Sequence, residues 1–180
     1  MNSIVQLKIL EENNTKLIIE TIYKLKEKIC DIDFVKNNIL LMDQKTNYIA
    51  NSTPSSIRKG IATFRDVFIQ IFNDEYNQIG FAVISTDIKN ELLTLQVLVI
   101  DKLYKTALSN SINTLLKLIN GIIIISSNKL KVTLQNSING YPIDSPLRDL
   151  GFIRESSMYL DETMKRKQID YVLNLQGEIV

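Results

Sequence analysis

The sequence predicts an α+β domain built on a central mixed, mostly antiparallel sheet that is flanked by helices. In residues 64–100, β-rich segments are separated by short polar turns, which is typical of an antiparallel meander. An amphipathic helical stripe then precedes a further alternating segment, and such a strand–helix–strand crossover makes its two strands parallel. Because 180 residues suit one domain, we expect a single domain over residues 1–180.

The segment before the meander predicts one strand and one or two helices. Residues 3–10 alternate with the period of two that is typical of a strand. The next apolar stripe predicts a helix that runs to Cys30, and it consists of Leu17, Ile18, Ile22, Leu25 and Ile29. The less regular sequence that follows predicts a short helix at about residues 33–43, and then a loop over the Ser/Thr/Pro cluster at 52–56.

The remaining elements follow from the same periodicities. The meander consists of "FRDVFIQIF", "IGFAVISTDI" and "ELLTLQVLVI". The helix after it carries a stripe of Leu108, Ile112, Leu115, Leu116 and Ile119. "IIIISS" either extends this helix or begins a strand. "KLKVTLQN" predicts a strand, "INGYPIDSPLRDL" at most a short helix, and "FIRESSMYL" pairs with "QIDYVLNLQ" as a hairpin across "DETMKRK".

Composition argues against several classes of function. Lys and Arg total 21 and Asp and Glu total 20, so bulk charge does not favour nucleic acid or an anionic membrane. With no histidine and only Cys30, neither a zinc site, a Ser-His-Asp triad nor an internal disulfide is expected. The N-terminus is acidic where a signal peptide is apolar, and no apolar run approaches a membrane span. We therefore expect a cytoplasmic protein with no metal, nucleic-acid or membrane partner.

The order of these elements, with "LGFIRE" just before the last two strands, resembles the GNAT superfamily of N-acetyltransferases. The resemblance covers almost the whole chain. It implies splayed strands 4 and 5, here "ELLTLQVLVI" and "KLKVTLQN", with acyl-coenzyme A in the gap between them. It also implies that Gly151 ends the last short helix in a left-handed conformation, which suits glycine sterically.

The resemblance further implies acetyl-CoA as cofactor and assigns residues to it. Backbone groups of Leu98, Val99 and Ile100 would hold the pantetheine arm. The following loop would wrap the pyrophosphate with amides at a helix N-terminus, where the helix dipole favours an anion. The loop residues that correspond to this role are Lys105, Thr106, Ala107, Leu108, Ser109 and Asn110.

This loop departs from the glycine-rich pattern of the family. Leu108 and Asn110 occupy the two small positions, and Lys102 replaces a proline. A Cβ at such a position obstructs close approach of the backbone to a pyrophosphate. Two outcomes remain open: the hydroxyl and amide donors of Thr106, Ser109, Asn110 and Ser111 still hold a phosphate, or coenzyme A binding has been lost. Without a ligand, the polar loop would serve as the N-cap of its helix.

Catalysis in the family needs a base for the substrate ammonium and commonly an acid for the departing thiolate, often a tyrosine of the last short helix. At the tyrosine position this chain has Leu147. Thr94 and Gln96 stand where a carboxylate base is expected on the central strand. None of these three side chains can exchange a proton at neutral pH.

Other residues must supply the acid and the base if the protein is catalytic. The candidates are Glu91, at the entrance of the central strand, and Tyr159, on the final hairpin, with Asp101 and Tyr141 as alternatives. A carboxylate at a strand end is more often simply solvated, and a tyrosine on an alternating strand more often packs against the core.

Two functions therefore stay open. One is transfer of an acetyl group from acetyl-CoA to an amine, on a small molecule or a protein. The other is a GNAT-fold binding or regulatory module without catalysis or acetyl-CoA binding, which the missing glycines, tyrosine and strand carboxylate favour. "INGYPIDSPLRDLGF" also has some likeness to the closing segment of large helicase-related proteins, but only over that segment. A homodimer is left open.

Overall fold

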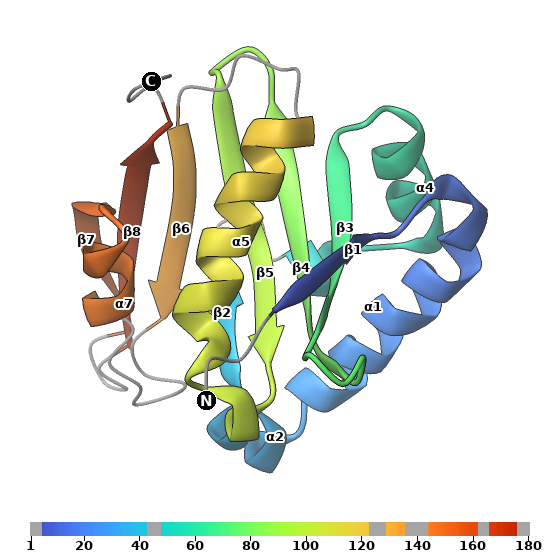
Figure 1. Ribbon diagram of the computed structural model, residues 1–180, viewed down its shortest axis with the longest axis horizontal. Coiled ribbons are helices and arrows are strands. Elements are labelled where there is room, and N and C mark those ends of the chain that lie inside the picture. The colour runs from blue at the N-terminus through green and yellow to red at the C-terminus, as the bar shows by residue number, and fades with distance from the viewer. Residues whose placement is uncertain (1–4, 43–47, 123–128, 136–143, 162–165, 176–180) are drawn as a thin grey trace.

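The computed structural model describes residues 5–42, 48–122, 129–135, 144–161 and 166–175. Its elements, in chain order, are β1 (Gln6–Ile9), η1 (Glu12–Asn14), α1 (Thr15–Ile29), α2 (Ile32–Asn37), β2 (Ile39–Met42), α3 (Tyr48–Asn51), α4 (Pro54–Ala62), β3 (Asp66–Phe72), β4 (Gln78–Asp87), β5 (Leu92–Ile100), η2 (Lys102–Tyr104), α5 (Ala107–Ile122), β6 (Lys129–Gln135), α7 (Asp144–Asp149), β7 (Ile153–Asp161) and β8 (Arg166–Asn174). Figure 1 shows their arrangement.

One mixed sheet organises the described part of the chain. Its strand order is β1-β3-β4-β5-β6-β8-β7, and β2 pairs with β5 beside this path. Every pairing is antiparallel except that of β5 with β6, so the predicted mixed and mostly antiparallel sheet is confirmed. The predicted meander corresponds to β3, β4 and β5, and the predicted hairpin to β7 and β8.

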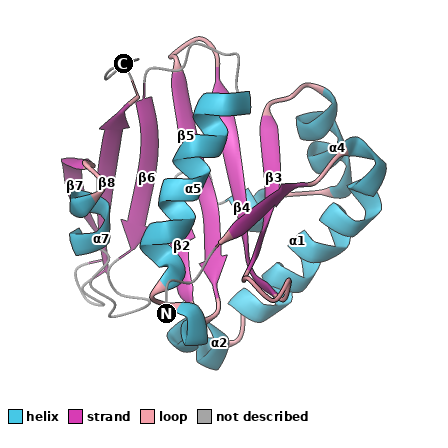
Figure 2. Cartoon of the chain, viewed as in Figure 1, coloured by secondary structure: helices cyan, strands magenta, loops and turns pink. Residues whose placement is uncertain are grey.

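Two clusters of buried apolar side chains lie on opposite faces of the sheet. α5 covers one face with Leu108, Ile112 and Leu115. α1 covers the other face with Ile18 and Ile22, and α3 and α4 contribute to the same cluster (Figure 2). Burial of each such side chain stabilises the fold by about 1.5–3 kcal/mol, which explains why the amphipathic stripes predict these helices. None of the helices in the described segments is long and apolar enough to cross a membrane.

The helix predicted at about residues 33–43 is wrong in its second half. α2 ends at Asn37, Asn38 is extended with φ −118° and ψ 150°, and Ile39–Met42 forms β2. Periodicity alone cannot separate a short buried strand from a buried helical turn, because both are continuous apolar runs. Here the free edge of β5 decides the outcome, and the sequence around residue 40 carries no sign of that edge.

The loop predicted over residues 52–56 is also wrong, because a helix begins there. Thr53 is the N-cap of α4, and its side chain accepts from the Ser56 amide at 3.1 Å. The Ser56 hydroxyl in turn accepts from the Thr53 amide at 2.8 Å, which completes a capping box with Pro54 as the first helical residue. The Ser/Thr/Pro cluster is thus a helix start signal.

Gly151 ends α7 as predicted. Its φ of +86° lies in the left-handed region, which glycine adopts without a Cβ clash. The Gly151 amide donates to Arg148 O and the Phe152 amide to Leu147 O, both at 2.9 Å, so the last carbonyls of the helix are satisfied. The question of whether "IIIISS" is helix or strand falls almost entirely on residues 123–128, outside the described residues.

Candidate functional site

The edge of β5 that faces away from β4 is bordered by different strands along its two halves. The first half pairs with β6 in parallel, from Leu92 opposite Lys129 to Leu95 opposite Val132. Beyond Leu95 no pairing joins β5 to β6, although both strands continue. The predicted splayed pair is therefore confirmed: the two strands run side by side for four residues and then separate.

A bulge marks the point where β5 leaves β6. Val83 of β4 is opposite Val97 and Ile84 is opposite Leu95, so Gln96 has no partner on β4. Such an extra residue bends a strand and increases its local twist. The Gln96 side chain is buried, with 6% of its surface exposed, and the bend lies inside the sheet, at the start of the separation.

β2 occupies the edge of β5 that this separation frees. Ile39 is opposite Ile100 and Met42 is opposite Val97, in antiparallel register. β2 also lies close to β6, so this short strand fills the gap between the two splayed strands (Figure 1). The backbone of Leu98, Val99 and Ile100, which the resemblance assigns to pantetheine, is thus paired with the chain's own strand in this structure.

The loop after β5 leads into the buried first turn of α5. Ala107 and Leu108 are each only 1% exposed and pack in the core under α5, whereas Lys105 and Asn110 are exposed. Leu108 therefore directs its side chain into the core. Ser111 is fully buried, and its hydroxyl has no hydrogen-bond partner within the described segments, so it is closed to solvent in this structure.

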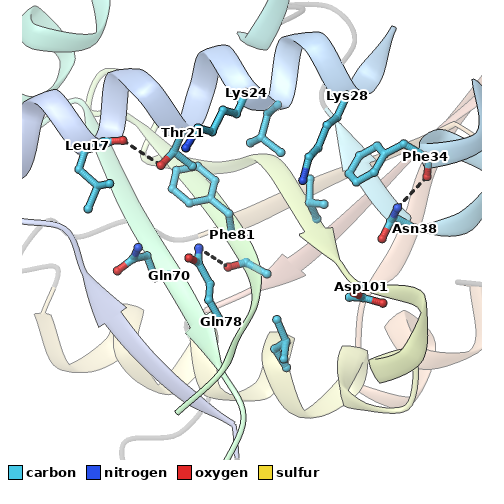
Figure 3. Close-up of a pocket in the computed structure, with 14 residues that line it drawn as sticks. Leu17, Thr21, Lys24, Lys28, Phe34, Asn38, Gln70, Gln78, Phe81 and Asp101 are labelled. Carbon is cyan, nitrogen blue, oxygen red and sulfur yellow. Dashed lines mark hydrogen bonds between the residues drawn. The ribbon is translucent and has the colours of Figure 1, made fainter. Parts of the chain in front are cut away.

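A groove of about 370 Å³ lies between α1, α2 and the sheet, at the end where β5 and β6 separate (Figure 3). Lys24 and Lys28 project from α1 towards the sheet, and Asp101, directly after β5, lies at its border. Gln70 of β3 contributes a side chain that is only 9% exposed. The remaining lining consists of Leu17, Thr21, Leu25, Phe34, Asn38, Gln78, Ile79, Gly80, Phe81 and Val99.

A second pocket, of about 320 Å³, contains a buried carboxylate on the same face of the sheet. Asp66 accepts from Arg65 Nη2 and from Ser85 Oγ, each at 2.6 Å, and from the Tyr48 hydroxyl at 3.3 Å. The hydrogen bond to Asp66 raises the pKa of Arg65. Burial first, and then the charge of Asp66, raises the pKa of Tyr48. With so many donors the carboxylate is saturated, which suits a structural role. Gln96 lines this pocket as well.

No known protein-family model matches the sequence, and no curated protein matches it. Solved structures do match. A spermidine N-acetyltransferase from Vibrio cholerae, in complex with CoA and spermine, superposes with a TM-score of 0.65 over 96% of both chains at 11% identity. An N-acetyltransferase from Staphylococcus aureus Mu50 gives 0.62 over 96% of this chain and 99% of that chain, also at 11% identity. The chain has the GNAT fold.

In this GNAT fold the candidate catalytic residues lie far apart. Glu91 is in the turn before β5, with φ +50°, at the end opposite to Leu98–Ile100. Tyr159 is on β7, opposite Lys167 and two strands beyond β6. Along the strands the register separates Glu91 and Tyr159 by on the order of 25 Å, so they cannot serve one reaction centre.

The alternative residues are placed differently. Asp101 lies at the exit of β5, where it borders the groove, and its carboxylate accepts from the Leu103 amide at 2.9 Å. Tyr141 is outside the described residues. Leu147 is fully buried in the core. Of the carboxylates predicted from the sequence, Asp101 alone lies beside the separated half of β5.

Sequence reasoning missed Asp66 and its partners, which come from segments far apart in the chain. Two local signals exist. Asp66 opens a strand whose other residues, apart from Gln70, are apolar, and Gly60 lies close enough that a Cβ there would collide with the Asp66 carboxylate. An acidic residue on a buried strand beside a helical glycine indicates a buried polar cluster, because only glycine leaves space for the side chain.

Tyr48→Phe is expected to reduce stability by about 1 kcal/mol at neutral pH, because Asp66 loses a hydrogen bond. This difference from wild type should narrow at alkaline pH. The pKa of Tyr48 is higher in the folded protein than in the unfolded chain, where it is about 10. The stability that the neutral Tyr48 hydroxyl contributes is therefore complete below about pH 10, and it is lost as the pH rises towards the pKa of the folded protein. Urea unfolding between pH 8 and 11 measures it.

The matched control for this experiment is Tyr76→Phe, because Tyr76 is 73% exposed. Substitution at such an exposed position should change the free energy of unfolding by less than about 0.5 kcal/mol at neutral pH. A constant difference between wild type and Tyr48→Phe over the whole pH range would mean that Tyr48 ionises alike in the folded and unfolded states.

Proposed function

We propose that the protein is an acetyl-CoA-dependent N-acetyltransferase that transfers an acetyl group to an amine on a small molecule or a protein. The observation that carries this proposal is the separation of β5 from β6 after Leu95, with the bulge at Gln96. It leaves one edge of Val97–Ile100 with backbone groups that, among the described residues, only the short β2 pairs with. Support also comes from the fold, because a GNAT-fold neighbour has been solved with CoA and spermine.

The freed edge of β5 suits an extended ligand that carries amides. In an antiparallel pairing, every second residue directs its N–H and C=O to a given edge, and an added strand forms its hydrogen bonds with those groups. A pantetheine arm has amides of the same kind, and Leu98 to Ile100 would hold it. β2 uses the same edge, so we infer that β2 leaves it when acetyl-CoA binds.

The displacement of β2 has a moderate energetic cost. A backbone hydrogen bond contributes about 0.5–1.5 kcal/mol net, and the four paired residues of β2 can form only a few of them with β5. The bound pantetheine would replace those bonds on the β5 side. The free energy needed to release β2 from β5 is thus small enough for cofactor binding to offset. The apparent affinity for acetyl-CoA equals the affinity of the open form multiplied by the fraction of molecules that are open.

The chemistry requires removal of a proton from the acceptor ammonium before attack. When bound, acetyl-CoA supplies the thioester, whose C–S bond breaks as the N–C bond forms. Asp101 is the residue that we assign to the proton, through water, because it adjoins Ile100 and borders the groove. Its hydrogen bond from the Leu103 amide keeps the carboxylate at the strand exit. The departing thiolate takes its proton from solvent.

A second function is favoured by one specific observation. β2 sits on the edge that the cofactor would need, and Thr94 and Gln96 leave the centre of β5 without a carboxylate. A GNAT-fold module that has lost acetyl-CoA binding would have this arrangement permanently. The two functions differ in whether the pairing of β2 with β5 is reversible.

A disulfide across the two strands tests this difference. Leu41 and Leu98 are opposite each other, so their Cα atoms are about 4.5–5.5 Å apart, within the disulfide range. In a Cys30→Ser background, the reduced Leu41→Cys/Leu98→Cys protein should gain thermal stability with acetyl-CoA, by about 2.7 kcal/mol at a hundredfold excess over Kd. The oxidised protein should gain none, because β2 cannot leave.

Leu41→Pro serves as the companion variant, since proline weakens a β-ladder and should release β2. It should bind acetyl-CoA at least as tightly as wild type. Equal binding by the oxidised and reduced proteins would show that β2 does not compete. If wild type, the reduced protein and Leu41→Pro all fail to bind acetyl-CoA, the proposed function is overturned and the module without cofactor is favoured.

Asp101→Asn should lower kcat/KM for acetyl transfer about a hundredfold or more, because the amide cannot take a proton. Its side-chain oxygen can still accept from the Leu103 amide, so the fold should be retained. Steady-state kinetics with a panel of amines measures the effect, and Glu91→Gln is the matched control at the other end of β5. A large loss in Glu91→Gln, with Asp101→Asn unaffected, would contradict our assignment.

A further inference from the structure

The groove between α1 and the sheet has an uncompensated positive wall. Lys24 and Lys28 are one helical turn apart, and both ammonium groups point from α1 towards the sheet (Figure 3). Among the described residues, neither forms an ion pair with a carboxylate; Lys28 Nζ lies 5.4 Å from the centre of the Phe34 ring. Two neighbouring cations without an anion favour a negatively charged ligand.

The floor of the groove carries a side-chain amide that is open to a ligand. Gln70 is 9% exposed, and its side chain has no hydrogen-bond partner in the described part of the chain. Figure 3 shows it beneath α1 with its amide end inside the groove. The amide atoms themselves are not fully buried, so the Gln70 side chain is open to the groove and can bond a polar ligand or water there. The Gln78 amide, in contrast, donates to Gly80 O at 3.3 Å.

The border of the groove at the exit of β5 has the opposite charge. Asp101 supplies a carboxylate there, next to the stretch that the proposed function assigns to acetyl-CoA. Leu17, Phe81 and Val99 give the groove apolar surface, and its volume of about 370 Å³ suits a small molecule. The groove therefore offers cations along α1, an amide on its floor and an anion at one border.

We propose that this groove binds a small amine that also carries a carboxylate or phosphate group. The anion lies against Lys24 and Lys28, the Gln70 amide bonds its polar atoms, and the ammonium is directed towards Asp101. In terms of the proposed function, on which this part rests, such an amine is the acetyl acceptor. The groove would discriminate against polyamines, because a ligand with several ammonium groups and no anion is repelled by the two lysines.

The test is calorimetric titration of the wild-type protein, without acetyl-CoA, with three probes. They are β-alanine, O-phosphoethanolamine and spermidine, each up to about 10 mM. At least one of the two anionic amines should bind, and whichever binds more tightly identifies the anion. Spermidine should bind at least tenfold more weakly. Binding of spermidine as tight as that of the anionic amines, or no binding of either anionic amine, would overturn the proposal.

Variants locate the binding in the groove. Lys24→Gln/Lys28→Gln should weaken binding of the anionic amine about tenfold or more, because charge-assisted hydrogen bonds are lost. Lys16→Gln is the matched control, since Lys16 lies on the same helix, is 92% exposed and is near Glu20. Gln70→Leu should weaken binding while thermal stability is kept or raised. Unchanged affinity in the double lysine variant would place the ligand elsewhere.

An acetyl-transfer assay with the same probes separates this inference from the proposed function. Binding of an anionic amine that depends on Lys24 and Lys28, without acetyl transfer by wild type or Leu41→Pro, would uphold the groove and contradict the transferase. Transfer to spermidine in preference to the anionic amines would uphold the transferase and contradict the groove.

Discussion

The backbone groups of β5 beyond the bulge at Gln96 are the constraint on which the rest of the structure depends. β4 pairs with β5 from Leu92 to Ile100, interrupted only by the bulge, but β6 follows β5 only as far as Leu95. The other edge of Val97–Ile100 lies in the middle of a sheet, where an unpaired backbone N–H or C=O costs about 1–3 kcal/mol. Something must pair with that edge. In this structure β2 does so, and our account is that acetyl-CoA can take its place.

The segment that fills this edge also builds the groove. α2 leads directly into β2, and Phe34 and Asn38, on either side of the end of α2, line the groove against α1. Lys102, in the loop after β5, donates to the Asn37 side chain at 3.2 Å, so the end of α2 is also tied to the loop that carries Asp101. A movement of β2 would reshape the groove as it opens the edge. Under the proposed function, α2 and β2 would therefore couple cofactor binding to acceptor binding.

Prediction from the sequence succeeded where the signal is local. The stripes of α1 and α5, the alternation of the meander and the left-handed Gly151 depend on neighbours within a few residues. β2 was missed because its conformation is imposed by the edge of β5, some sixty residues later in the chain, and no local period encodes it. The Asp66 cluster was missed for the same reason, since Tyr48, Asp66 and Ser85 meet only after folding. Glu91 and Tyr159 were predicted from their residue type and their place in the chain, which carry no information on the distance between them.

Hydrogen exchange of backbone amides in the wild-type protein, with and without saturating acetyl-CoA, tests the central claim most directly. If β2 and the pantetheine arm use one edge in turn, the amides of Ile39–Met42 lose protection when acetyl-CoA binds, whereas those of Val97–Ile100 stay protected because they exchange one partner for another. Full protection of Ile39–Met42 in the presence of bound acetyl-CoA would contradict the account, since β2 would then still be paired with β5 and the cofactor would lie elsewhere.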